Sequence, residues 1–203
     1  MSLLPVFMKM AGRRVLVVGA GNVAAEKIES LLQAEAAITV VAPEGLESVA
    51  KLADEGQVIW HRREFAAEDL EGVFVAIAAT ASVEVNHRVF ALAVERGILC
   101  NAVDDPPYCD FYFGSVVRRG DLQVAVSTGG ESPAVAQGLR RELEAALPRD
   151  LGPWLGEVGR LRREVLASHP AGAERKALLH TLAQREVCGA AECPTRLLAR
   201  RGL

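Results

Sequence analysis

Gly19, Gly21 and Ala24 stand at the spacing G-x-G-x-x-A, which is typical of a loop that binds the pyrophosphate of a dinucleotide. They follow four aliphatic residues, 15–18, and precede a helix-forming run. In this order the glycines let the backbone turn tightly and approach the phosphates, and the alanine lets helix and strand pack closely. The helix N-terminus adds unpaired N–H groups and a partial positive charge. Small residues also serve strand–helix packing without a ligand, but the strand–turn–helix context favours a dinucleotide site.

Loops after four predicted strands meet at the edge of a sheet where a Rossmann-type domain binds its ligand. These loops are residues 19–23, 42–44, 78–80 and 101–107. In the second of them, Glu44 lies just past the usual place of the acidic residue that holds the ribose hydroxyls. No lysine or arginine follows Glu44 before Lys51, so NAD is favoured over NADP. The candidate cofactor-binding residues in these loops are Gly19, Gly21, Glu44, Ala79, Thr80 and Asn101.

Two carboxylates, Asp104 and Asp105, follow a predicted strand at the rim of the same edge. A carboxylate in this place could act as a general base. Asp-Asp-Pro-Pro is also an ordinary turn sequence. A catalytic and a structural interpretation of Asp104 therefore both stay open at this point.

A second glycine-rich loop, residues 127–133, leads into a helix that Ser132 and Pro133 begin. Its hydroxyls and N–H groups suit a carboxylate or a phosphate, although a capped turn explains the same residues equally well. The arginines that flank the loop could hold carboxylates through two parallel hydrogen bonds. The candidate substrate-binding residues are Ser127, Thr128, Gly129, Gly130, Arg118 and Arg140.

Alternating strand-like and helix-like segments position the first two groups of residues. The predicted strands are 15–18, 38–42, 58–60, 73–79 and 98–103, and the predicted helices are 24–33, 46–53 and 84–95. Strands that are separated by helices indicate a parallel, doubly wound sheet. We therefore expect an α/β protein with a Rossmann-type domain over residues 1–113.

The pattern changes after residue 113. Two strands, 113–118 and 122–127, and a helix, 134–147, are predicted to form a small α+β segment over residues 114–148. Such a segment is too small to bury its own core, so we expect it to pack on a neighbour or on a second subunit. Two further helices, 154–167 and 173–187, predict a helical domain over residues 149–203.

The composition is that of a soluble globular protein, with half of its 203 residues hydrophobic and a net charge of −3. No apolar run approaches the ~20 residues that span a bilayer, and no secretory leader is visible, so we expect a cytoplasmic protein without a membrane partner. Residues 148–203 are basic, whereas the rest of the chain is acidic. A solvated helical face or attraction for an anionic substrate explains the basic tail, and nucleic acid is disfavoured because no aromatic residues alternate with its charges.

The four cysteines have no zinc-type C-x-x-C pairing. Cys188 and Cys193 are five residues apart in a predicted loop, and free thiols in a reducing compartment explain them more simply than a metal does. The histidines are scattered along the chain. The sequence therefore predicts no metal site.

Taken together, these blocks resemble the precorrin-2 dehydrogenase and sirohydrochlorin ferrochelatase family, the N-terminal portion of siroheme synthases. The matching blocks keep the family's order and spacing across about 150 positions, and this shared order is more specific than any one block. They are Leu4-Pro5-Val6-Phe7, residues 17–24 with Lys27, residues 39–43, residues 76–80, Asn86, residues 100–104, residues 124–130 and Ser132-Pro133.

The resemblance implies NAD-dependent oxidation of precorrin-2 to sirohydrochlorin, with Asp104 as the general base. It leaves open whether the protein also inserts ferrous iron to give siroheme. Asn22, Val23, Pro43 and Glu44 match the family's NAD-contacting positions. Residues 114–148 match its dimerisation region, so the resemblance implies a homodimer.

Two other classes of function compete with this enzyme. An NAD-binding regulatory module would share the glycine loop and the sheet but needs neither Asp104 nor residues 127–133. A tetrapyrrole or metal carrier would keep the fold and lack catalysis. Formation of NADH from precorrin-2 distinguishes the enzyme from both.

Overall fold

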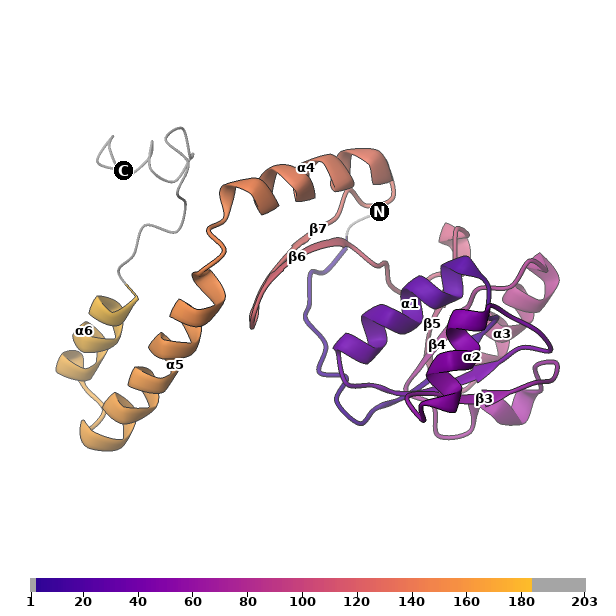
Figure 1. Ribbon diagram of the computed structural model, residues 1–203, viewed down its shortest axis with the longest axis horizontal. Coiled ribbons are helices and arrows are strands. Elements are labelled where there is room, and N and C mark those ends of the chain that lie inside the picture. Colours follow the sequence, from indigo (N-terminus) through magenta and orange to yellow (C-terminus); the bar gives the residue numbers. More distant parts are fainter. Residues whose placement is uncertain (1–2, 184–203) are drawn as a thin grey trace. The chain divides into compact units, whose positions relative to one another are not determined.

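A computed structural model describes residues 3–183 (Figure 1). The chain divides into two compact units, one ending at Tyr112 and one beginning at Phe113. Cys188, Cys193 and the last residues of the helix predicted to reach residue 187 lie outside the described part of the chain. Each unit is described by itself below.

The first unit alternates strands and helices in the order that the sequence predicts. Its strands and helices are β1 (Arg14–Val18), α1 (Asn22–Gln33), β2 (Ala37–Val41), α2 (Glu47–Asp54), β3 (Ile59–His61), β4 (Val75–Ala78), α3 (Val83–Glu95) and β5 (Leu99–Ala102). Two short 3₁₀ turns, Ala67–Leu70 and Pro106–Tyr108, were not apparent in the sequence.

All five strands are parallel and lie in the order β3-β2-β1-β4-β5. The crossover between β3 and β4 carries the chain from one edge of the sheet to the other side of β1, so the loops after β1 and β4 lie side by side. In open sheets of this kind, ligands bind outside the carboxyl ends of the strands at such a switch in strand order. The predicted parallel Rossmann-type sheet is confirmed.

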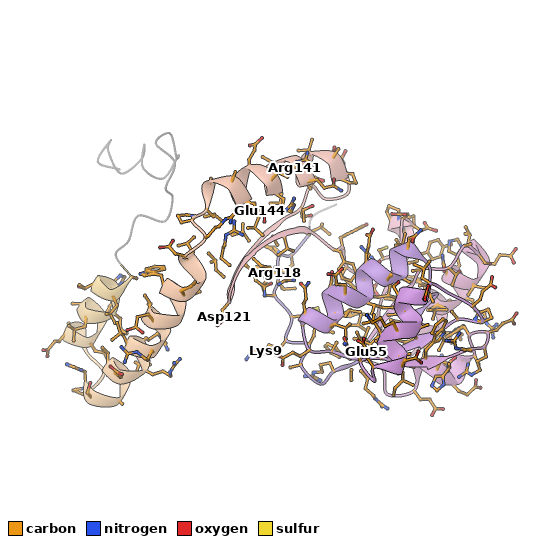
Figure 2. The ribbon with its side chains drawn as sticks, viewed as in Figure 1. Lys9, Glu55, Arg118, Asp121, Arg141 and Glu144 are labelled. Carbon is orange, nitrogen blue, oxygen red and sulfur yellow. The ribbon has the colours of Figure 1, made fainter. Side chains whose placement is uncertain are left out.

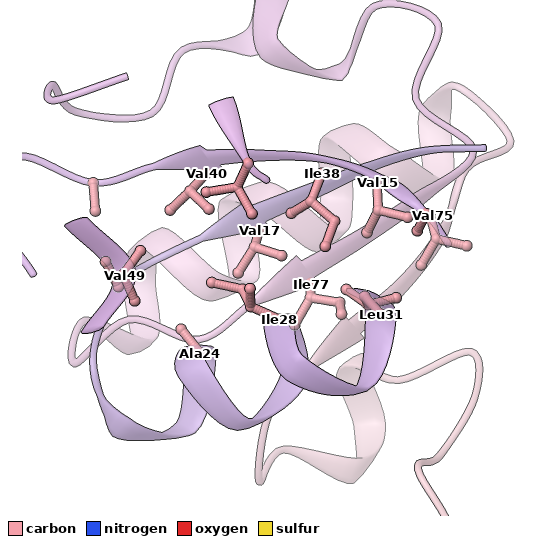
Figure 3. Packing of buried hydrophobic residues seen from close by; sticks show 14 of the residues in the cluster. Val15, Val17, Ala24, Ile28, Leu31, Ile38, Val40, Val49, Val75 and Ile77 are labelled. Carbon is pink, nitrogen blue, oxygen red and sulfur yellow. The ribbon is translucent and has the colours of Figure 1, made fainter. Parts of the chain in front are cut away.

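Alternate side chains of the central strand enter two different cores. Val15 and Val17 pack with Ile28 of α1 and Val49 of α2 (Figure 3). The intervening residues of β1 pack on the opposite face with Val89 of α3. Both faces of the sheet are therefore covered by helices, which explains why β1 and β4 are apolar without alternation.

The second unit consists of an antiparallel hairpin and three helices. Its elements are β6 (Ser115–Arg119), β7 (Leu122–Val126), α4 (Pro133–Ala146), α5 (Leu151–Ser168) and α6 (Ala173–Leu182). Helix α5 begins three residues before the predicted position, because Pro153 lies in its first turn, where a missing N–H has no cost. A side chain on Gly152 would come within 2.9 Å of the backbone of Arg119, so α5 starts directly against the hairpin turn.

The predicted boundaries at residues 114–148 and 149–203 both fall within this second unit and stay predictions. Among residues 3–183, no helix is both long and apolar enough to cross a membrane.

Candidate functional site

The turn after β1 requires glycine at its first position. Gly19 has φ +110°, and a Cβ there would lie 2.3 Å from the carbonyl oxygen of Ala79. Its N–H donates to the carbonyl of Val41 at 2.9 Å. The turn is thus fixed between the ends of β2 and β4, and no other residue type fits without displacing the loop after β4.

Gly21 differs from Gly19 because nothing in the described part of the chain requires a glycine there. Its φ is −82°, and no atom lies within 4 Å of the place that a Cβ would take. Gly21 is the N-cap of α1, which has no side-chain cap and no acidic residue in its first turn. Among residues 3–183, the first N–H groups of α1 therefore have no side-chain capping acceptor, and the open space above Gly21 lets an anionic ligand approach them closely.

The loop after β2 is fastened to the glycine turn. Leu46 N–H donates to Ala20 O at 3.0 Å, and a Cβ on Gly45 would lie 2.3 Å from that of Ala20. Trp60 of β3 donates its indole N–H to Ala42 O at 3.0 Å and closes the other side of the loop. These contacts hold Pro43 and Glu44 at the carboxyl edge, where both are exposed. Sequence reasoning missed Gly45 and Trp60.

The loop after β4 is fixed by a buried amide. Asn86 accepts the backbone N–H of Thr80 at its Oδ1, 3.1 Å away, and donates its Nδ2 to Thr80 O at 3.1 Å. The Thr80 hydroxyl lies 2.8 Å from the same Oδ1. Ser82 caps the following helix by accepting the N–H of Val85. Ala79 and Thr80 are consequently held beside Gly19, as the predicted cofactor role requires.

Asn101 is buried, and its side-chain amide bonds to other groups of the protein. Its Nδ2 donates to Phe111 O at 2.7 Å and lies 3.2 Å from Cys109 Sγ. The side chain fastens residues 109–111 along β5. This geometry gives Asn101 a structural function. The predicted contact of Asn101 with the cofactor stays a prediction.

Asp104 lies just past the end of β5, is exposed and has φ +63°. A left-handed backbone is uncommon for a residue other than glycine, although aspartate adopts it more readily than most. Val103, which precedes it, donates its N–H to Ala78 O at 2.9 Å. The carboxylate therefore stands at the same edge as the glycine turn, as predicted.

A cluster that the sequence did not reveal lies beside Asp104. His87 Nε2 is 2.6 Å from Asp105 Oδ2, and the His87 ring stacks on Tyr108 with centroids 3.6 Å apart. Phe90 meets Tyr108 edge-on at 5.4 Å. His87 and Phe90 belong to α3, which follows β4, whereas Asp105 and Tyr108 belong to the loop after β5 that also contains the predicted general base. No local spacing signals a pair of residues 18 positions apart.

The second glycine-rich loop uses its hydroxyls internally. Ser127 Oγ accepts the N–H of Gly129, Thr128 Oγ1 accepts the N–H of Ser132, and Ser132 Oγ caps α4 by accepting the N–H of Val135. Gly129 and Gly130 have φ of +64° and +91°, as a tight turn requires. The capped-turn interpretation accounts for these contacts, and the predicted role in substrate binding stays a prediction.

The predicted substrate arginines have different surroundings. Arg140 on α4 forms an ion pair with Glu144, which also receives Arg119. Arg118 on β6 is exposed, and Figure 2 shows it apart from Arg141 and Glu144 of α4. Arg119, Arg140 and Arg141 line a hollow of about 780 Å³. Its excess of positive charge is consistent with carboxylate binding but equally stabilises the C-terminal end of α4.

Neither metal ligation nor a reactive thiol is apparent at this edge. Residues 3–183 contain no group of three or more His, Cys, Asp or Glu side chains that could hold a metal ion. Burial, with Asp110 and Cys109 nearby, raises the pKa of the Cys100 thiol to about 12. Burial also raises the pKa of Cys109, whose thiol donates to Ala102 O at 3.0 Å. Both thiols are therefore neutral at physiological pH.

Comparison with known proteins finds similarity along both units. The family described as putative NAD(P)-binding matches residues 6–115, and the family described as the central part of sirohaem biosynthesis proteins matches residues 119–146. Siroheme synthase 1 of Serratia proteamaculans (strain 568) is 44% identical over 176 residues, and siroheme synthase of Neisseria meningitidis serogroup C (strain 053442) is 43% identical over 176 residues. Both alignments cover 87% of this chain.

The chain spans 37% of the length of each of these two relatives. Among solved structures, SirC, a precorrin-2 dehydrogenase, has a TM-score of 0.78 at 25% identity, and the match covers 98% of both chains.

Proposed function

Because this chain belongs to the family of putative NAD(P)-binding proteins, we propose that it is an NAD-dependent dehydrogenase that oxidises precorrin-2 to sirohydrochlorin. The observation that carries the cofactor assignment is the uncapped N-terminus of α1 beneath the open space at Gly21. The similarity to siroheme synthases and to SirC supports the substrate and the place in siroheme synthesis.

Residues of the first unit would hold the cofactor. The backbone of residues 19–23, including Asn22 and Val23, would bind the pyrophosphate at the start of α1. Glu44, with Pro43 beside it, would accept the ribose hydroxyls. Ala79 and Thr80 would border the cofactor from β4. When bound, NAD supplies the acceptor for the hydride that leaves the tetrapyrrole.

The chain's own chemical contribution is the removal of a proton. Oxidation of precorrin-2 releases one hydride and one proton. Asp104 presents an exposed carboxylate at the edge where the cofactor would lie, so a carboxylate oxygen takes up the proton and passes it to water.

The substrate is expected to meet the second unit through its carboxylates. Arg118, Arg140 and residues 127–130 are the proposed contacts. The second unit has few buried apolar residues in its described part, which supports its packing on a second copy in a homodimer. A cytoplasmic location belongs to the same proposal. Size-exclusion chromatography with light scattering tests the dimer, and a monomer at micromolar concentration would contradict it.

The enzymatic proposal is tested by incubating the purified chain with precorrin-2 and NAD and recording NADH absorbance. We expect NADH with the wild type and at least a hundredfold lower kcat with Asp104→Asn, since loss of a general base typically costs about 10²–10⁴-fold. Asp54→Asn, a change at an exposed aspartate of α2, is the matched control.

Binding of NAD without any NADH would favour the regulatory module and overturn the dehydrogenase. An Asp104→Asn variant that turns over at the wild-type rate would remove the general-base assignment and leave the dehydrogenase in place.

Iron insertion stays a prediction from family resemblance. Sirohydrochlorin with ferrous iron, with and without the protein, measures it directly, and equal rates would limit the activity to dehydrogenation.

A further inference from the structure

We propose that His87 is a positioning residue that acts through Asp105 to hold Asp104 in its left-handed conformation at the edge of the sheet. The inference rests on the proposed function for the chemical role of Asp104. The conformational part stands on the geometry of residues 102–109 alone.

The backbone of Asp104 needs an external constraint. In a residue with a Cβ, a positive φ brings the Cβ against the following carbonyl, so an unconstrained turn relaxes toward the right-handed or extended region. Among residues 3–183, Glu35 is the one other non-glycine residue with positive φ, at +59°. Glu35 is held by backbone hydrogen bonds to Leu32 and Gly12. On the N-terminal side of Asp104, the backbone is held by the hydrogen bond from Val103 to Ala78. On its C-terminal side, the backbone is held through Asp105.

Asp105 is fixed at its N–H, its carbonyl and its carboxylate. The N–H donates to Ala102 O at 3.1 Å, and the carbonyl accepts the N–H of Tyr108 at 2.9 Å. The same carbonyl lies 3.3 Å from the Sγ of Cys109. The carboxylate accepts His87 Nε2 at 2.6 Å. Of these contacts, the one with His87 ties Asp105 to α3, the helix that precedes β5 in the sequence.

His87 is itself held rigidly. It lies in the second turn of α3, with its ring stacked on Tyr108 at 14° between the planes. Phe90, on the same helix, packs edge-on against Tyr108. Because the carboxylate is an acceptor, Nε2 must carry the proton. The ring therefore delivers a directed donor from α3 to the turn after β5.

Loss of this donor is expected to release the turn without disturbing the glycine loop. The carboxylate of Asp104 then samples positions away from the reacting carbon, and a displacement of this kind lowers the rate of the chemical step more than binding. We expect His87→Phe, which keeps an aromatic ring for the stack, to lower kcat about tenfold. The dissociation constant of NAD and the KM for NAD should stay within about twofold.

Two further variants separate positioning from a general structural effect. His87→Gln keeps a side-chain N–H donor near Asp105 and is expected to recover at least half of the lost kcat. Arg88→Gln changes the neighbouring exposed position on α3 and is expected to keep wild-type kcat.

Amide hydrogen exchange gives a measurement that does not depend on activity. In His87→Phe we expect the amides of Asp105 and Tyr108 to exchange at least tenfold faster, while the amide of Ala76 in β4 keeps its protection. Unchanged exchange at Asp105 and Tyr108 would overturn the inference. Faster exchange with unchanged kcat would overturn the link to Asp104. A wild-type protein that forms no NADH would contradict the proposed function, and the exchange experiment would still decide whether His87 holds the turn.

Discussion

The two units of the chain bury apolar side chains to very different extents. In the first unit both faces of the sheet are covered, and β1 and β4 are buried along nearly their whole length. In the described part of the second unit, the buried hydrophobic residues are Val117, Ala136 and Leu151. The first unit can therefore fold on its own core, whereas the second depends on further contacts for its stability.

The same difference affects how each unit holds its candidate residues. Around the glycine turn, groups from β2, β3, β4 and α3 fix the loops after β1, β2 and β4 through hydrogen bonds between elements. In residues 127–133 the hydroxyls bond within the loop itself and to the first turn of α4. The first region is preorganised for a ligand, and the second leaves more of its order to a partner or a substrate.

The largest expected effect compares two glycines with positive φ. Gly19→Ala places a Cβ 2.3 Å from Ala79 O and should destabilise the protein by about 3 kcal/mol or more. Gly130→Ala meets no atom of residues 3–183 within 4 Å and should cost about 1 kcal/mol, the strain of φ +91° alone. Urea unfolding measures both. Equal costs would contradict the difference in packing between the two regions.

A control within the first region separates fold from ligand binding. Gly21→Ala should change stability by no more than about 0.5 kcal/mol, because the space above Gly21 is open. It should weaken NAD binding at least tenfold, measured by calorimetry. Wild-type affinity for NAD in this variant would contradict the proposed pyrophosphate site.

The next effect compares one core substitution in each unit. Val17→Ala should lower the free energy of unfolding by about 2–3 kcal/mol and Val117→Ala by about 1 kcal/mol. The difference is expected because few buried side chains surround Val117, so its neighbours can move into the cavity more easily. The two tryptophans, Trp60 and Trp154, lie in different units and report each unfolding transition by fluorescence. Equal costs would mean that the second unit has a core as firm as the first.

The thiol of Cys100 makes the first unit sensitive to high pH. Its folded pKa of about 12 lies above the unfolded value of about 8.5–9, so the folded state retains a proton that the unfolded state loses. The stability that the protonated Cys100 thiol contributes is therefore fully present below about pH 9 and is lost as the pH rises toward 12. Unfolding free energy should fall by up to about 1.4 kcal/mol per pH unit in this range. Cys100→Ala, followed by the same urea titrations, should reduce this slope, and an unchanged slope would contradict the assignment.

The smallest effect is expected on the surface of the second unit. Arg160 on α5 forms ion pairs with Glu157 and Glu164, which raise its pKa and lower that of Glu157. All three side chains are exposed, so water and salt screen the attraction. Arg160→Ala should shift the melting temperature by less than about 2 °C in a thermal scan. A larger shift would show that charge pairs supply the stability that buried side chains do not.

Sequence patterns predicted the sheet well because its signals are local. Apolar runs at residues 15–18 and 73–79 mark β1 and β4 within one or two residues, and the glycine turn follows from its spacing. The 3₁₀ turn at Pro106–Tyr108 carries no periodic signal and was missed. The sequence patterns predicted a parallel sheet but not the strand order β3-β2-β1-β4-β5, because the handedness rule for crossovers does not fix which edge of the sheet each strand joins.

The contacts that shape the site are harder to predict because they join distant residues. Trp60 bonds to Ala42 and His87 to Asp105, each across 18 residues. The first pair depends on the register of β3 against β2, and the second on how α3 packs beside β5. The left-handed conformation of Asp104 has no signal in its neighbours along the chain. Residue types and spacing therefore predicted which loops meet at the carboxyl edge of the sheet, but not the side-chain contacts that fix these loops.

The covered edge of β5 has a consequence for aggregation. Asp110 accepts the N–H of Cys100 at 2.9 Å through its carboxylate and donates its own N–H to Cys100 O at 2.8 Å, and the thiol of Cys109 caps Ala102 O. At the opposite edge, β3 offers three residues. An exposed strand edge is a template on which a foreign or newly made chain can add. Here each edge is either occupied or short, so the sheet resists growth into fibrillar assemblies even when many copies are synthesised together.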